Sequence, residues 1–262
     1  MTQAAAVTDG RGGAAALGAR AALEDARLRL ADASPSQILR WAADRFAPQL
    51  AFATGFGPEG LVILDLIARH RLDVDVFTLD TGLLFPETVA LWRRLEEKYG
   101  RGIRGVSPAL DLEEQASRHG EKLWETAPDR CCGIRKVDPL AQALSGHEAW
   151  ISAIRADQTR DRAQASVVEA DGRFGLVKVN PLLAWSSDEV WAYLRDNDVP
   201  TNPLHQQGYP SIGCRPCTSP VSPGEDPRAG RWRGRAKTEC GLHSRPSRSV
   251  SSFSLVPRPE GA

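Results

Sequence analysis

The residues in this sequence best suited to chemistry are its five cysteines. Four of them form two pairs, Cys131 with Cys132 and Cys214 with Cys217, and 81 residues separate the pairs. Two intervening residues let both sulfurs of Cys214 and Cys217 reach one metal centre. Four soft thiolates suit a zinc ion or an iron–sulfur cluster. Adjacent cysteines are unusual ligands because neighbouring side chains diverge, so two ordinary half-buried thiols are the alternative for the first pair.

The fifth cysteine, Cys240, lies in a basic C-terminal segment. A thiol becomes a nucleophile when nearby cationic groups lower its pKa. The basic residues around this thiol are Arg231, Arg233, Arg235, Lys237 and His243. The alternative is an accidental thiol in a tail, and His243 alone is more often an exposed histidine than a general base. Cys240 is therefore a candidate nucleophile.

A glycine-rich turn follows the first apolar run of the chain. Thr54, Gly55 and Gly57 come directly after residues 50–53 and before the apolar run 61–68. A strand, a glycine-rich turn and a helix place backbone N–H groups where they can receive an anion. The turn matches neither a Walker A sequence nor a GxGxxG fingerprint, so a plain turn is the alternative.

Two further strand ends carry polar side chains. Asp80 follows the run 74–79, and Arg155 follows the run 150–154, with Arg160 close behind it. Arginine side chains at such a place can bind a phosphate or sulfate with two hydrogen bonds. An ordinary loop at Asp80 and a surface arginine at Arg155 are the alternatives.

Short apolar runs alternate with amphipathic segments along the middle of the chain. This order predicts an α/β fold with an open, mostly parallel twisted sheet flanked by helices. We expect strands at 50–53, 74–79, 103–107 and 150–154, a hairpin from 166–169 and 176–179, and helices at 35–46, 61–68, 86–99, 112–118, 136–144 and 190–195. In such sheets ligands bind at the carboxyl ends of the strands, where the three candidate segments fall.

Length and composition limit the function classes. The chain has 262 residues and 33 basic and 33 acidic side chains, so no net charge draws it to nucleic acid or to a membrane surface. No apolar run approaches the length of a membrane span. Paired cysteines in a chain without a secretory signal favour a cytoplasmic protein with metal or redox sites.

The same patterns divide the chain into three parts. We expect residues 1–33 to be a disordered extension with at most a short helix, residues 34–212 to form the α/β domain, and residues 213–262 to be an irregular, basic and mobile tail. The oligomeric state is left open, a homo-oligomer included.

Taken together, the motifs resemble the assimilatory sulfonucleotide reductases, which are similar in fold to the PP-loop ATP pyrophosphatases, or adenine nucleotide alpha hydrolases. The matching segments run in order from about residue 36 to 243. They are 54–57, 79–82, 131–137, 154–160, 180–182, 213–218, 230–232 and the Glu-Cys-Gly-Leu-His sequence 239–243.

The resemblance implies an adenylyl-sulfate reductase of sulfate assimilation, with one 4Fe–4S cluster and reduced thioredoxin as electron donor. Cys131, Cys132, Cys214 and Cys217 would ligate the cluster, and Cys240 would attack adenosine 5′-phosphosulfate to give an S-sulfocysteine. The implied substrate-binding residues are Thr54, Gly55, Gly57, Asp80, Lys136, Arg155, Arg160, Arg231 and His243.

Three other functions are weighed against this one. A reductase of 3′-phosphoadenosine 5′-phosphosulfate is the nearest, although relatives with that substrate generally lack the four paired cysteines. A nucleotide-binding protein with a structural zinc would not need Cys240. An ATP-using PP-loop ligase or thiolase is disfavoured because the loop at Thr54 lacks the full pyrophosphatase signature.

Overall fold

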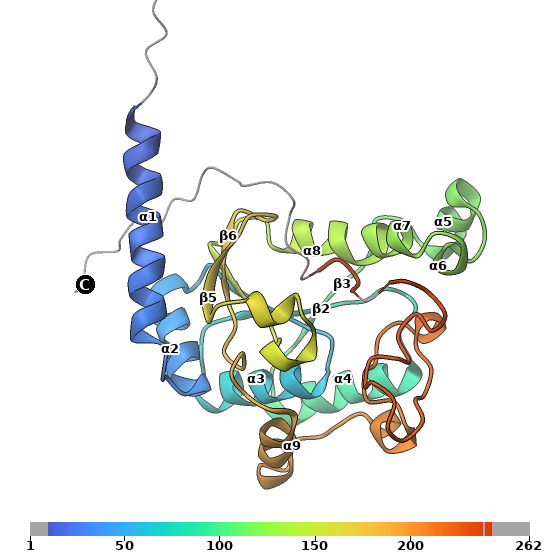
Figure 1. Ribbon diagram of the computed structural model, residues 1–262. Coiled ribbons are helices and arrows are strands. Elements are labelled where there is room, and N and C mark those ends of the chain that lie inside the picture. Colours follow the sequence, from blue (N-terminus) through green and yellow to red (C-terminus); the bar gives the residue numbers. More distant parts are fainter. Residues whose placement is uncertain (1–9, 238, 243–262) are drawn as a thin grey trace, which may run out of the picture.

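The computed structural model describes residues 10–237 and 239–242, and within them the strands form one six-stranded sheet (Figure 1). The strand order is β3-β2-β1-β4-β6-β5, and only β5 runs antiparallel to its neighbour. The strands are β1 (Leu50–Thr54), β2 (Asp75–Leu79), β3 (Arg104–Val106), β4 (Ala149–Ile151), β5 (Val168–Asp171) and β6 (Leu176–Val179). The predicted mostly parallel α/β sheet with a hairpin at its edge is confirmed.

Helices cover both faces of the sheet, as Figure 1 shows. Leu50 and Phe52 of β1 belong to a core shared with one helical layer, whereas Ala51 between them belongs to the core on the opposite face. This alternation follows from the two-residue period of a strand. The first layer contains α2 (Pro35–Phe46), α3 (Pro58–Arg69), α4 (Pro86–Tyr99) and α9 (Ser187–Asp196), and the second contains α8 (Asp138–Ala143).

Local capping signals fix where several helices begin. Ser186 and Glu189 form a capping box, in which the Glu189 N–H donates to Ser186 Oγ at 3.2 Å and the Ser186 N–H donates to Glu189 Oε2 at 2.7 Å. Helix α9 consequently starts at Ser187, earlier than the expected start at residue 190. Each reciprocal bond satisfies one N–H group that the first helical turn leaves free.

The N-terminal region differs from the prediction. We expected residues 1–33 to be disordered apart from a short helix, but α1 spans Gly10–Arg29. Leu23, Ala26 and Leu30 are buried, and Arg27 Nε donates to the carbonyl of Val168 in β5 at 2.8 Å. These contacts lie far apart in the sequence, so the local composition, rich in alanine and arginine, did not indicate them.

The segment between β3 and β4 is more finely divided than expected. Three short helices, α5 (Leu112–His119), α6 (Leu123–Thr126) and α7 (Pro128–Cys132), precede a π-helical turn at Gly133–Val137 that leads into α8. The prediction had two helices here, at 112–118 and 136–144: α5 confirms the first, while α6, α7 and the π turn were not expected. A π turn holds one extra residue in its hydrogen-bonded ring and often occurs at functional sites.

The C-terminal segment is irregular, as predicted. Up to residue 242 and leaving out residue 238, it contains a 3₁₀ turn at Arg215–Cys217 and an isolated bridge between Thr218 and Arg231. Among the described residues, no helix has both the length and the apolar character required to cross a membrane.

Candidate active site

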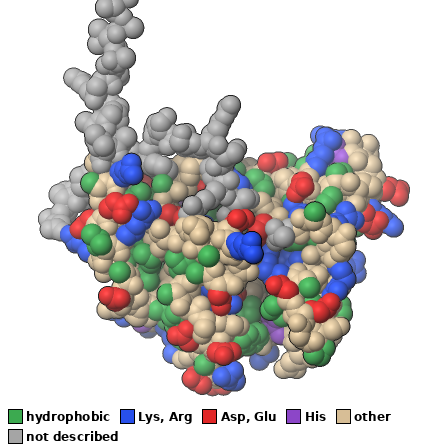
Figure 2. Space-filling model, in the orientation of Figure 1, with side chains coloured by type: hydrophobic (Ala, Val, Ile, Leu, Met, Phe, Trp, Pro, Cys, Tyr) green, Lys and Arg blue, Asp and Glu red, His purple; other side chains and the backbone are tan. Residues whose placement is uncertain are grey.

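A cavity of about 730 Å³ opens at the carboxyl ends of β1, β2 and β4. Its volume lies within the range of small-ligand sites. Figure 2 shows Lys and Arg side chains gathered beside a hollow in this face of the molecule. Eight residues proposed from the sequence line the cavity: Thr54, Gly55, Gly57, Lys136, Arg155, Cys214, Arg231 and Cys240.

The turn between β1 and α3 has the form of an anion site. The Phe56 N–H donates to Thr54 Oγ1 at 3.1 Å, and Phe56 adopts a left-handed backbone with φ of 57°. A Cβ atom at Gly60 would lie 2.7 Å from the same Thr54 oxygen, so only glycine permits this close approach. The N-cap of α3 is Gly57, which offers no capping side chain, and the first N–H groups of α3 remain open to a ligand.

Arg155 is less available than the sequence indicated. Its guanidinium forms a buried ion pair with Glu59 in the first turn of α3, and its Nε lies 3.0 Å from Asp157 Oδ1. Two carboxylates therefore already compensate the charge of this arginine. Its main contribution here is to fix the wall of the cavity beside the β1–α3 turn.

Two cations of the cavity have no such partner. Within the described part of the chain, no carboxylate lies within ion-pair distance of Lys136 or Arg231. The Arg231 guanidinium packs against the ring of Trp232 at 4.5 Å, and a Cβ atom at Gly213 would lie 2.2 Å from Arg231 Nη2. Gly213 thus leaves the space that this guanidinium occupies.

Lys136 connects the cavity with the cysteines. Burial by itself lowers the pKa of its ammonium group, but the nearby sulfurs of Cys214, Cys240 and Cys132 outweigh burial, and the pKa is raised. Lys136 is therefore a cation at neutral pH, close to the Cys240 sulfur. This side chain can screen the repulsion between an anionic ligand and an anionic thiolate.

The four paired cysteines line a second, smaller cavity. Cys131 and Cys132 end α7, while Cys214 directly precedes the 3₁₀ turn and Cys217 is its last residue. The other side chains that line the cavity are Leu83, Trp124, Pro128, Arg135, Lys136 and Trp232. The fold thus brings together two pairs that are far apart in the sequence.

Burial disfavours the deprotonated, thiolate form of these cysteines when no metal is bound. It raises the pKa of the Cys131 and Cys217 thiols, and it raises the pKa of Cys132 to about 11. A metal centre would reverse this preference, because a bound cation stabilises the thiolate that ligates it. Four thiolate ligands would give a metal group negative charge. The cations Arg135 and Lys136, which line the same cavity, can compensate that charge, so these residues fit such a group. Among the described residues, no three His, Cys, Asp or Glu side chains converge closely enough to hold one single ion.

The turn after β2 holds both cysteine pairs in place. Arg135 Nε donates to the carbonyl of Thr81 at 2.5 Å, and Thr81 Oγ1 lies 3.4 Å from Cys214 Sγ. The Arg215 N–H donates to the carbonyl of Leu83 at 2.8 Å. From sequence this turn was equally well interpreted as an ordinary loop, and its role as a support for the cysteines was missed.

Comparison with known proteins agrees with this arrangement. The family model of the phosphoadenosine phosphosulfate reductase domain matches residues 49–220, which include the β1–α3 turn and both cysteine pairs. The chain belongs to this reductase family. The resemblance to the sulfonucleotide reductases is thereby confirmed.

Relatives in the family carry two substrate names. The adenosine 5′-phosphosulfate reductase 1 of Bacillus subtilis (strain 168) is 51% identical over 207 residues, 79% of this chain and 89% of that protein. The phosphoadenosine 5′-phosphosulfate reductase of Gloeobacter violaceus is 46% identical over 216 residues, 81% of this chain and 90% of that protein.

Solved structures support the same fold. The phosphoadenylyl-sulfate reductase of Candida auris, in a phosphate complex, has a TM-score of 0.67 and 34% identity, covering 76% of this chain and 96% of that chain. The FMN adenylyltransferase of Candida glabrata, with a TM-score of 0.53 and 14% identity, covers 83% of this chain and 78% of its own. The second likeness concerns the fold alone.

Two predicted substrate-binding residues of this reductase-family protein, Asp80 and Arg160, do not line the cavity. Asp80 instead accepts a hydrogen bond from the Gly82 N–H at 3.0 Å, and its neighbour Thr81 lines the cavity. Arg160 is exposed and lines neither cavity, whereas Arg162 lines the larger one. His243 lies outside the described residues.

Three charged groups at this site are not among the predicted site residues, although Arg162 follows Arg155 and Arg160 in the predicted anion-binding segment. Arg162 and Arg228 line the larger cavity, and both lie within ion-pair distance of Glu239, the residue before Cys240. The only sequence signal was the surplus of arginine in these two segments, which does not indicate how the side chains pair.

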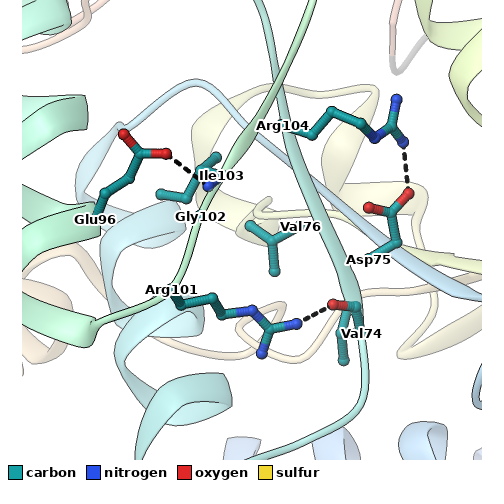
Figure 3. Close-up of a pocket in the computed structure, with 8 residues that line it drawn as sticks. All are labelled: Val74, Asp75, Val76, Glu96, Arg101, Gly102, Ile103 and Arg104. Atoms are coloured by element: carbon teal, nitrogen blue, oxygen red, sulfur yellow. Dashed lines mark hydrogen bonds and ion pairs between the residues drawn. The ribbon is translucent and has the colours of Figure 1, made fainter.

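A second depression, of about 380 Å³, lies at the opposite ends of β2 and β3 (Figure 3). Its charged groups bind one another: Arg104 Nη2 lies 2.5 Å from Asp75 Oδ2, Arg101 donates to the carbonyl of Val74, and Glu96 accepts from the Ile103 N–H at 2.8 Å. This depression therefore offers little charge to a ligand, and it lies away from the reductase-family cysteines.

Proposed function

We propose that this protein reduces adenosine 5′-phosphosulfate to sulfite and AMP, with Cys240 as the nucleophile. The observation that carries the proposal is the position of Cys240 in the wall of a strand-end cavity, beside the cations Lys136 and Arg231. An anionic sulfonucleotide needs such cations near the sulfur that is attacked. The names of the relatives support the reaction class.

The reaction needs two thiol steps. The Cys240 thiolate attacks the sulfur of the sulfate group, the bond from that sulfur to the bridging oxygen breaks, and AMP leaves with the electron pair. The product is an S-sulfocysteine. A thiolate of a dithiol reductant then attacks Cys240 Sγ, sulfite leaves, and the second thiol of the reductant displaces Cys240 to form a disulfide. Reduced thioredoxin is the proposed reductant.

The described residues have separate tasks in this scheme. The open N–H groups of α3 and the turn at Thr54 would receive the nucleotide phosphate, as helix N-termini do. Lys136 and Arg231 would face the sulfate group and lower its repulsion of the approaching thiolate. These interactions strengthen as negative charge develops on the bridging oxygen.

A 4Fe–4S cluster is the metal group we propose for the smaller cavity, held by Cys131, Cys132, Cys214 and Cys217. Each thiolate of such a cluster binds a different iron, so the sulfurs need not converge on one point as they do around a zinc ion. Four thiolate donors lining one small cavity are the ligand set of such a cluster, which supports the choice. When bound, the cluster supplies a local electrostatic field beside Lys136, and the thiol steps need no electron from it.

Comparing two nucleotides tests the proposed substrate. With a dithiol reductant present, adenosine 5′-phosphosulfate should be turned over at least about tenfold more efficiently than its 3′-phosphorylated form. Among the described residues that line the cavity, only the cations Lys136 and Arg231 lack a carboxylate partner, and both are assigned to the sulfate group. The 3′-phosphorylated substrate stays the second candidate, because the Gloeobacter violaceus relative bears that name. Measured kcat/KM values that favour the 3′-phosphorylated form would replace the first proposal with the second.

Removing either cation should slow the first step. We expect Lys136→Ala and Arg231→Ala each to lower kcat/KM about 10- to 100-fold, the value of one lost charge-assisted hydrogen bond. Arg160→Ala is the matched control, because Arg160 is exposed and lies outside the cavity. Equal losses in Arg160→Ala and Arg231→Ala would contradict the assignment. The cytoplasmic location and the oligomeric state stay predictions.

A further inference from the structure

We propose that Glu239 is a positioning residue that holds Cys240 at the cavity by pairing with Arg162 and Arg228. The inference rests on the proposed role of Cys240 as nucleophile and deepens it. It assigns a task to a carboxylate that would otherwise be out of place, because an anionic side chain beside an anion-binding cavity repels the substrate.

The ion pair is bidentate and nearly buried. Arg162 Nε lies 3.0 Å from Glu239 Oε1, and Arg162 Nη2 lies 3.1 Å from Glu239 Oε2. Arg228 Nη2 adds a contact of 3.4 Å to the second oxygen. Glu239 and Arg162 are each only 10% exposed, so water screens this pair much less than a surface pair.

Arg162 belongs to the body of the protein. It begins a 3₁₀ turn, Arg162–Gln164, between β4 and β5, and its backbone N–H donates to Thr159 Oγ1 at 3.3 Å. Its Nη1 also donates to Gln158 Oε1. With its side chain held by Gln158 and its backbone by Thr159, Arg162 presents a fixed partner to a residue that lies 77 positions later in the chain.

The residues after the nucleophile make weaker contacts. Gly241 adopts φ of 89°, and a Cβ atom there would lie 3.5 Å from Val137 Cγ2. Leu242 packs at the edge of the core cluster around α8 as a partly buried side chain. Cys240 therefore lies between one strong ionic contact and a short apolar one. Both contacts join the wall of the cavity, since Leu242 lines it as Arg162 and Arg228 do, but only the contact of Glu239 is ionic.

A different role for the same contact leads to an opposite result. If Glu239 mainly competed with the nucleotide for Arg162 and Arg228, removing its charge would tighten nucleotide binding. If Glu239 positions Cys240, removing its charge should leave nucleotide affinity nearly unchanged, because Lys136 and Arg231 are not partners of Glu239. The same change should make the Cys240 thiol more mobile and more accessible to reagents.

The test compares Glu239→Gln, Glu239→Asp and the control Glu225→Gln in the full chain purified without oxygen. Glu225 pairs with Arg233 at 3.0 Å in the same C-terminal segment but lines no part of the cavity. The readouts are the rate of Cys240 alkylation by iodoacetamide, followed by peptide mass spectrometry, the single-turnover release of AMP, and the Kd of AMP.

We expect Glu239→Gln to alkylate at Cys240 several times faster and to release AMP about tenfold more slowly, with the Kd of AMP changed less than about twofold. Glu239→Asp should restore part of both rates, and Glu225→Gln should match the unmodified protein. An unchanged alkylation rate in Glu239→Gln, or a tighter Kd of AMP, would overturn the proposal. Loss of AMP release in Cys240→Ser is independent of these outcomes, so failure here would leave the proposed function intact.

Discussion

Replacing Cys240 by serine is expected to lower the release of AMP and sulfite by at least about 10³-fold, because a serine hydroxyl at neutral pH is a far weaker nucleophile than a thiolate. The measurement is AMP and sulfite formation from adenosine 5′-phosphosulfate with a dithiol reductant. The change is small in volume, so the contacts of Glu239 and Leu242 on either side should persist.

The same variant separates chemistry from binding. Cys240→Ser should keep its iron and should bind AMP with nearly unchanged affinity, since Cys240 is not one of the paired cysteines. Release of both products at the unmodified rate would show that another group is the nucleophile.

Replacing Cys214 by alanine is expected to remove most of the bound iron. Cys214 is buried and lies 3.4 Å from Thr81 Oγ1, and a neutral hydroxyl is a much poorer ligand for iron–sulfur iron than a soft thiolate. Structural metal sites lose much of their binding free energy with one ligand. Iron and acid-labile sulfide per chain, together with visible absorption under exclusion of oxygen, measure the effect.

Cys240→Ser serves as the matched control here, because it also removes one sulfur but leaves the smaller cavity intact. An unmodified protein that holds one zinc ion and no iron would contradict the cluster assignment. So would a Cys214→Ala variant that keeps full iron and sulfide.

Local patterns were sufficient to predict the scaffold. The alternation in β1 follows from Leu50, Ala51 and Phe52, and the capping box at Ser186 fixes α9. The turn at Thr54 lies at the carboxyl end of β1 and lines the cavity, as the rules of sheet topology predict. These features depend on residues close together in the sequence or on the rules of sheet topology.

Features that depend on long-range pairing could not be predicted in this way. The sequence contains several arginines near Arg155, and nothing local indicates that Arg155 pairs with Glu59 while Arg162 pairs with Glu239. Asp80 and Thr81 differ by one position at a strand end, and the choice of which side chain faces the cavity depends on the exact strand boundary. The helix α1 is similarly stabilised by distant contacts with the core and with β5.

The turn after β2 has a consequence for the thermodynamics of metal uptake. Thr81 and Leu83 hold Arg135 on one side and the Cys214–Arg215 segment on the other through protein hydrogen bonds alone. Folding of the sheet therefore offsets the entropy cost of closing the long loop between the cysteine pairs. Binding of the metal group does not have to offset that cost. In a zinc finger, part of the free energy of metal binding drives folding, which lowers the observed affinity for the metal. Because the present site is formed by protein contacts, its observed affinity for the metal group can stay close to the intrinsic value.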